Sequence, residues 1–217
     1  MEKIYSLFDH LVQKYITPDS LVLDAGCGAK TRFSNNSEYQ FIIGVDEDSS
    51  IVRNQQVDEK VISSLDSLPF ANKTFDMIVT YMVVEHMEDP EKCFAEFYRV
   101  CKQGAKVIIA TPNLYHYANY IVSITPTSWH DWYLKNIQKV SEKSFAVKHK
   151  ANTAGKLIEV MRRQGFILKE LQYIDLGPVH VYWIKPLYFL GMLYHKLVNH
   201  FEKLSFLRAD LFLVFEK

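Results

Sequence analysis

The chain has 217 residues, and its 25 basic and 25 acidic side chains give a formal net charge of zero. This balance lacks the positive charge of proteins that bind nucleic acid, so we expect a small-molecule substrate and no nucleic-acid partner. The hydrophobic fraction of 48% excludes a disordered chain, and the length suits a single domain over residues 1–217.

The cysteines and the apolar runs indicate a compartment. Cys27, Cys93 and Cys101 are odd in number and lack the spacing of metal ligands. We expect Cys93 and Cys101 to lie buried on the apolar face of one helix. The first residues do not resemble a signal peptide, and the run from Pro186 to Tyr194 is too short to span a bilayer. We therefore expect a cytoplasmic protein in a reducing environment.

The order of predicted elements indicates an α/β fold. Apolar residues recur at helical spacing from Ile4 to Tyr15, so the chain begins with an amphipathic helix. Asp89 and Pro90 begin another helix, and a third, capped by Asn152-Thr153, runs from about Ala154 to Arg163. The predicted strands are Leu21–Asp24, Phe41–Val45, Val61–Ser63, Met77–Tyr81, Lys106–Ala110, Ile167–Tyr173 and Ala209–Phe215. Such alternation is typical of a parallel sheet with helices on both faces, where ligands bind beyond the carboxyl ends of the strands.

The first two strands end in a pattern typical of a nucleotide site. Asp24 closes the first strand, and Gly26 and Gly28 follow where a ligand needs the backbone close. Asp46 closes the second strand about 20 residues later, where a carboxylate can accept hydrogen bonds from both hydroxyls of a ribose.

Three kinds of nucleotide loop compete for this segment. A dinucleotide fingerprint needs a glycine where Thr31 stands, and a phosphate-binding loop needs glycines at Asp24 and Ala29. The third pattern, an acid followed by alternating glycines, resembles the first motif of the class I S-adenosylmethionine-dependent methyltransferases. Lys30 stands in place of the third alternating glycine of that motif. A tight turn without a ligand is the structural alternative.

The resemblance continues from about Leu21 to Asn113 and is closest to the type 11 methyltransferases. Ser63–Phe70 resembles the family's adenine-side loop, with Ser64 where the family usually places an acid. Phe75–Tyr81 resembles its fourth strand, and Cys101–Asn113 its helix-turn-fifth-strand unit. The resemblance implies a Rossmann-like, mostly parallel seven-stranded sheet whose last strand is antiparallel.

The resemblance also implies S-adenosyl-L-methionine as cofactor and a set of residues that bind it. From the methionine end through the ribose to adenine, the set is Tyr81 by its backbone, Asp24, Gly26, Gly28, Asp46, Ser64 and Leu65. The implied layout is a core over 19–113, an acceptor-site insertion over about 114–152, and C-terminal strands with a helical insertion over about 175–208.

Two histidines are candidate general bases. The cofactor supplies the activated methyl group, so the protein mainly positions the acceptor, and an oxygen acceptor often needs a base. His86 follows the fourth strand, and histidine titrates near neutral pH. His130 lies in the aromatic stretch Asn113–Tyr133, which resembles the family's acceptor region, and Asp131 beside it is a further candidate. Each could instead be structural, with its ring packed or hydrogen-bonded to the backbone.

We expect no metal in this site. Glu85 and His86 resemble part of the E-x-x-E-H motif that holds a divalent metal in ubiquinone-pathway O-methyltransferases. Met82 replaces the first acid of that motif, and a thioether is a poor ligand for magnesium.

Two basic segments lie outside this core. Lys148-His149-Lys150 is expected to be a solvated cluster, the alternative being contact with an anionic acceptor. In residues 185–203, apolar side chains recur every three or four positions between basic ones. This predicts an amphipathic helix that packs over the sheet or against a second subunit in a homodimer, or that makes peripheral membrane contact.

We therefore expect a methyltransferase acting on an oxygen of a small-molecule acceptor of the glycan, lipid-linked or secondary-metabolite type. The departures from the family pattern at Lys30 and Ser64 favour an alternative, a catalytically inactive partner subunit with the same fold. A nicotinamide-dependent enzyme is a further rival.

Overall fold

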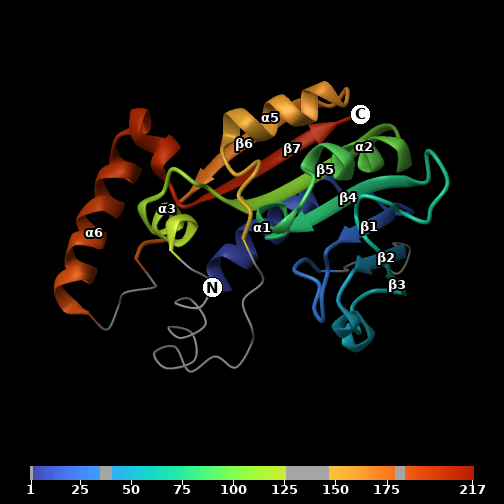
Figure 1. The fold of residues 1–217 in the computed structure, drawn as a ribbon, viewed down its shortest axis with the longest axis horizontal. Helices are drawn as coiled ribbons and strands as arrows, with labels where there is room; N and C mark the ends of the chain where they lie inside the picture. Colours follow the sequence, from blue (N-terminus) through green and yellow to red (C-terminus); the bar gives the residue numbers. More distant parts are fainter. Residues whose placement is uncertain (1, 35–40, 126–146, 179–183) are drawn as a thin grey trace.

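The computed structural model describes residues 2–34, 41–125, 147–178 and 184–217. Within them, seven strands form one sheet in the order β3-β2-β1-β4-β5-β7-β6 (Figure 1). The strands are β1 (Leu21–Ala25), β2 (Phe41–Asp46), β3 (Glu59–Ile62), β4 (Phe75–Tyr81), β5 (Cys101–Pro112), β6 (Ile167–Ile174) and β7 (Asp210–Glu216). The first five pair in parallel, and β7 runs antiparallel to both β5 and β6. This confirms the predicted Rossmann-like fold class.

Helices cover both faces of the sheet, as predicted. On one face, Phe8 and Val12 of α1 (Glu2–Tyr15) pack in one buried cluster with Val22 of β1. On the other, α2 (Pro90–Val100) and α5 (Ala154–Arg163) cover Leu23 and its neighbours (Figure 1). Because successive residues of a strand point to opposite faces, Val22 and Leu23 belong to different cores.

The N-terminal caps of α2 and α5 are those that the sequence predicts. The Asp89 carboxylate accepts a hydrogen bond from the backbone N–H of Lys92 at 3.1 Å, and the Thr153 hydroxyl accepts one from Lys156 at 3.3 Å. Each cap satisfies a backbone donor that the first helical turn leaves without a partner.

The predicted position of Cys101 on the α2 helix is wrong. The helix ends at Val100, and Cys101 opens β5, where it pairs with Phe75. Its thiol is buried, as are those of Cys27 and Cys93, and burial raises the pKa of all three to about 12. The expectation of buried thiols is therefore confirmed for the two cysteines for which it was made.

The long connection between β6 and β7 contains α6 (Lys185–His200) and the 3₁₀ helix η5 (Glu202–Leu207). Figure 1 shows α6 at the left end of the view, beside α3 (Tyr117–Ile124). Within α6 only Gly191 and Val198 are buried. Of the predicted apolar row, Tyr194 packs on Tyr117, whereas the other members are exposed: Leu187, Leu190, Leu197 and Phe201. In the part of the chain described, every helix is too short or too polar to cross a membrane.

Candidate cofactor and acceptor site

The loop after β1 needs glycine at its first turn. Gly26 has a φ of +77°, and a Cβ placed there would lie 2.4 Å from Cγ2 of Val83. The Gly26 N–H donates to the carbonyl of Val45 at 2.7 Å, which turns the loop over the end of β2. The loop is thereby held between the carboxyl ends of β2 and β4.

Asp24, at the end of β1, is a buried carboxyl with spare bonding capacity. Its side chain is only 4% exposed, and Oδ2 has no hydrogen-bond partner among the described residues. Burial raises its pKa to about 7, aided by the negative charge of Asp46 and opposed by a hydrogen bond from Thr31. An unpaired buried acceptor costs free energy, so this oxygen fits a ligand that brings a donor or a positive charge.

Asp46, at the end of β2, is oriented by two backbone donors. The N–H of Gly28 donates to Oδ2 at 2.8 Å, and the N–H of Asp48 donates to Oδ1 at 2.8 Å. A carboxylate has about four acceptor positions, so about two stay available on this half-exposed side chain. That arrangement fits the two adjacent hydroxyls of a ribose.

Asn54 was not predicted from the sequence, and it binds the glycine loop through two hydrogen bonds of its side chain. It lies just after η1 (Ser49–Arg53), is fully buried, and donates from Nδ2 to the Gly28 carbonyl at 3.3 Å and to Thr31 Oγ1 at 3.2 Å. No motif marks this position, since the contact joins residues more than twenty positions apart in the chain.

A hollow of about 340 Å³ lies between α1 and the end of the glycine loop. Lys30 and Arg32 line it together with Tyr5 and Asp9, and the Arg32 guanidinium lies 4.9 Å from the centroid of the Tyr5 ring. The Arg32 charge also acts on Asp24, whose pKa it lowers slightly against the effect of burial. Two cations therefore line this hollow, and the charge of one of them, Arg32, reaches Asp24.

The remaining predicted cofactor residues lie around the same rim. Ser63 donates its N–H to the Asp46 carbonyl at 3.1 Å, so half-buried Ser64 and buried Leu65 follow directly beside the β2 end. The ring of Tyr81 packs away from the rim on Tyr5 and Phe8 of α1, with centroid separations of 5.4 and 4.9 Å. Its backbone is thus the part that ends at the rim, while burial raises the pKa of its phenol.

Glu85 ties the segment before α5 to the ends of β4 and β5. It lies in the 3₁₀ turn η2 (Val84–His86) and is buried, which raises its pKa to about 7. Its Oε2 accepts from the Thr111 hydroxyl at 3.1 Å, and Thr111 in turn accepts from Asn152 Nδ2 at 2.6 Å. The Glu85 carbonyl accepts the N–H of Lys148 at 2.7 Å and that of His149 at 3.1 Å.

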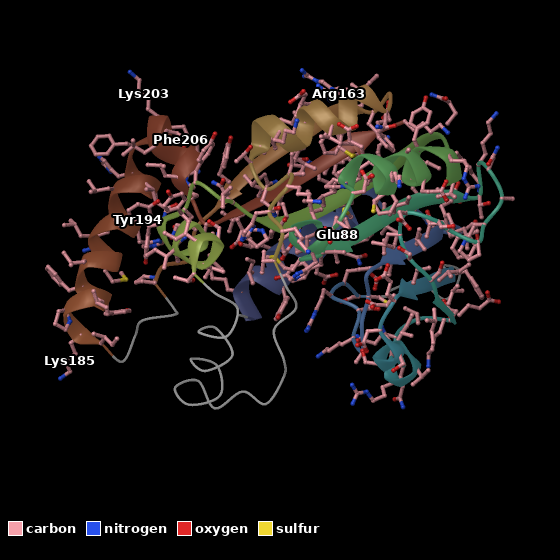
Figure 2. The ribbon with its side chains drawn as sticks, in the orientation of Figure 1. Glu88, Arg163, Lys185, Tyr194, Lys203 and Phe206 are labelled. Carbon is pink, nitrogen blue, oxygen red and sulfur yellow. The ribbon has the colours of Figure 1, made fainter. Side chains whose placement is uncertain are left out.

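This arrangement brings His149 beside His86, which the sequence did not indicate. The two ring nitrogens of His149 are buried and lack hydrogen-bond partners within the described ranges, and its φ of +51° is rare for a residue with a side chain. Burial and the neighbouring His86 lower the pKa of His149. The flanking lysines are solvated, as expected, and pair with Glu88, labelled in Figure 2.

The predicted acceptor region is only partly described. His130 and Asp131 lie outside the described residues, so their roles stay predictions. Of the earlier part, Tyr115 is exposed, whereas buried His116 places Nε2 3.6 Å from Oδ2 of Asp175. The Tyr117 ring packs on Tyr194 of α6 at 4.9 Å. Aromatic residues thus join α3 to α6 beside the rim.

Comparisons with known proteins agree with this geometry. A family model described as a methyltransferase domain matches residues 23–109. The chain is 27% identical over 156 residues to an uncharacterized protein of Methanocaldococcus jannaschii, covering 69% of this chain and 55% of that protein. It is 31% identical over 98 residues to a probable S-adenosylmethionine-dependent methyltransferase of Mycolicibacterium smegmatis, covering 42% of this chain and 38% of that one. The chain spans about half or less of these curated relatives.

A solved structure matches over nearly its whole length. It is a SAM-dependent methyltransferase from Methanosarcina mazei, with 17% sequence identity, 95% of this chain and 96% of that chain covered, and a TM-score of 0.63. At this identity the likeness concerns the fold, and the residues of the site rest on the geometry given above.

Proposed function

Since the chain belongs to the class I S-adenosylmethionine-dependent methyltransferases, we propose that it methylates an oxygen of a small-molecule acceptor. The observation that carries the proposal is the pairing of Asp24 and Asp46 at one rim. Asp24 has a buried oxygen without a hydrogen-bond partner among the described residues, and both oxygens of Asp46 are oriented by backbone donors. S-adenosylmethionine carries an ammonium at its methionine end, which can bond to Asp24. It also carries a ribose, whose two hydroxyls can bond to Asp46.

The residues at the rim fit the cofactor in order. Asp24 would accept a hydrogen bond from the methionine ammonium, and Lys30 and Arg32 would supply positive charge for the carboxylate of the methionine. Asp46 would hold the ribose, and Ser64 and Leu65 would flank the adenine. S-adenosylmethionine, when bound, supplies a methyl group activated by a sulfonium. Lys30 is exposed, and its N–H donates to the Cys27 carbonyl at 3.3 Å, so the loop forms without the family's third glycine.

His86 and His149 are proposed as the proton-accepting pair. A base must be unprotonated at the working pH, and the lowered pKa of His149 favours its neutral form. Within the described residues, neither ring nitrogen of His149 has a hydrogen-bond partner, so neither has to break a bond before it accepts a proton. Val83, which touches the Gly26 turn, lies three residues before His86, so the pair is close to the methionine end. His149 accepts the proton of the acceptor hydroxyl, and burial together with the neighbouring His86 favours its neutral form.

Calorimetric titration of the full chain tests the proposal. S-adenosylmethionine and S-adenosylhomocysteine should bind, whereas NAD should not. Binding of NAD alone would favour a nicotinamide enzyme. Tight S-adenosylmethionine binding, with no methyl transfer to any hydroxylated acceptor tried, would instead support the inactive partner subunit.

A further inference from the structure

The inner face of α6 is defined by a few close contacts. A Cβ at Gly191 would lie 2.5 Å from Cβ of Pro178, and Val198, seven residues on, is 1% exposed. Tyr194 donates its hydroxyl to the Leu207 carbonyl at 2.6 Å, and His195 Nδ1 lies 2.5 Å from Oδ1 of Asp175. These contacts fix which side of the helix faces the protein (Figure 2).

The side of α6 that adjoins this inner face is apolar and exposed. Four large apolar side chains recur there at helical spacing. They are Leu190 (60% exposed), Leu193 (50%), Leu197 (43%) and Phe201 (51%). Phe189 is 70% exposed. Contiguous exposed rows of large apolar side chains are uncommon on soluble proteins and mark a surface that another phase or molecule covers.

A basic row runs beside the apolar one. One side of the helix carries three basic residues and one phenylalanine, because spacings of 4, 7 and 4 positions approximate whole helical turns. They are Lys185, Phe189, Lys196 and His200. From Lys185 to Phe201 the sequence has no aspartate or glutamate. Figure 2 shows Lys185 at one end of α6 and Lys203, just beyond its other end, extending from the molecule.

We propose that α6 lies in the headgroup region of an anionic lipid bilayer. An apolar row for the acyl boundary beside a basic row for lipid phosphates is the pattern of an interfacial helix. The neighbouring helix α3 adds exposed Ile121 and Ile124. A second copy of the chain fits less well, because a two-fold contact through this face would bring one basic row near another, with no acidic residue of α6 to pair with either.

Vesicle co-sedimentation of the full chain tests the proposal. The protein should pellet with phosphatidylcholine vesicles that contain phosphatidylglycerol, bind much more weakly to phosphatidylcholine alone, and be released by salt. The double variant Lys185→Gln/Lys196→Gln should weaken binding on the order of thirtyfold. Leu190→Asp should weaken it similarly, and its exposed position leaves the fold intact, which circular dichroism checks.

Matched controls lie elsewhere on the surface. Val52→Asp replaces a 62% exposed apolar residue on η1, and Lys156→Gln removes an exposed charge on α5, so both should bind like the wild type. Absent binding to anionic vesicles, or equal binding by the α6 variants, overturns the proposal. So does a dimer in analytical ultracentrifugation that Leu190→Asp dissociates while vesicles go unbound, which would assign the face to a second copy.

Discussion

The backbone N–H of Gly28 donates to Oδ2 of Asp46 at 2.8 Å, joining the loop after β1 to the end of β2. This bond orients the carboxylate, and Gly28 makes it at a φ of +52°, a left-handed conformation that favours glycine. The glycine loop and the acid at the next strand end are therefore one structural unit rather than two separate motif elements.

Replacing Asp46 should weaken cofactor binding while the fold survives. Asp46→Ala removes a charged acceptor for two ribose hydroxyls, worth about 1.5–3 kcal/mol, so the Kd for S-adenosylmethionine should rise about tenfold to a hundredfold. Calorimetry measures this. Glu47→Ala, an exposed acid one residue further on, is the matched control and should bind like the wild type. An unchanged Kd in Asp46→Ala would remove Asp46 from the site.

A methyl group at Gly26 should destabilise the protein through Val83. Gly26→Ala places Cβ 2.4 Å from the valine side chain at a φ of +77°. Gly104 has a φ of +81° but no heavy atom within 4 Å of its Cβ position, so Gly104→Ala carries the backbone strain alone, about 1 kcal/mol. We expect Gly26→Ala to cost about 1–3 kcal/mol more in urea denaturation. Equal losses in the two variants would show that the Val83 contact is relaxed.

Loss of His86 should reduce turnover more than cofactor binding. His86→Ala removes one imidazole of the proposed pair and leaves Asp24 and Asp46 in place, so kcat should fall while the Kd for S-adenosylmethionine changes little. The readouts are methyl transfer to the true acceptor and calorimetry. A wild-type rate in this variant excludes His86 from catalysis.

His149 should set the acid side of the pH–rate profile. Its pKa is lowered from 6.5 by burial and by His86, with Glu85, Lys148, Lys150 and Glu88 as the other ionisable groups around the segment. A base with a lowered pKa loses activity only when the pH falls below the ordinary histidine range. In His149→Gln, kcat should drop on the order of 10²-fold and that acid limb should disappear. A retained limb with a normal rate would assign His149 a structural role.

The carboxyl of Asp24 should make the ligand-free protein less stable as pH rises. Its folded pKa is about 7, against 3.8 for the free side chain, so between these values the folded state holds a proton that the unfolded state has released. The stabilisation is fully present below pH 3.8 and is lost as pH rises through about 7, on the order of 4 kcal/mol at most. Urea denaturation at several pH values, comparing Asp24→Asn with Glu47→Gln, measures the slope. Asp24→Asn should flatten it, and an unaltered slope would contradict the assignment.

Local patterns in the sequence were sufficient to predict most of the fold. Strand alternation located the parallel core, and the Asp89 and Thr153 caps are those expected from the residue types. The start of β5 was missed because Cys101 pairs with Phe75, a contact outside any local window. The packed face of α6 was missed for a related reason, since it is selected by Pro178 and Asp175 rather than by the apolar row itself.

In the candidate site too, local motif residues could be predicted from the sequence, whereas residues brought in by long-range contacts could not. Asp24, Gly26, Gly28 and Asp46 form a short motif with regular spacing, so the sequence alone identifies them. His149 reaches the rim only through the carbonyl of Glu85, more than sixty residues earlier, and Asn54 reaches the glycine loop through an equally non-local contact. The spacing of residues along the chain carries no information about either.

A crystal structure of the full chain with S-adenosylhomocysteine tests the cofactor site most directly. We predict that the ribose hydroxyls bond to the Asp46 carboxylate, that the adenine lies by Ser64 and Leu65, and that the amino group pairs with Asp24 Oδ2. Density for the nucleoside elsewhere on the chain, or a rim still closed at saturating ligand, would contradict it.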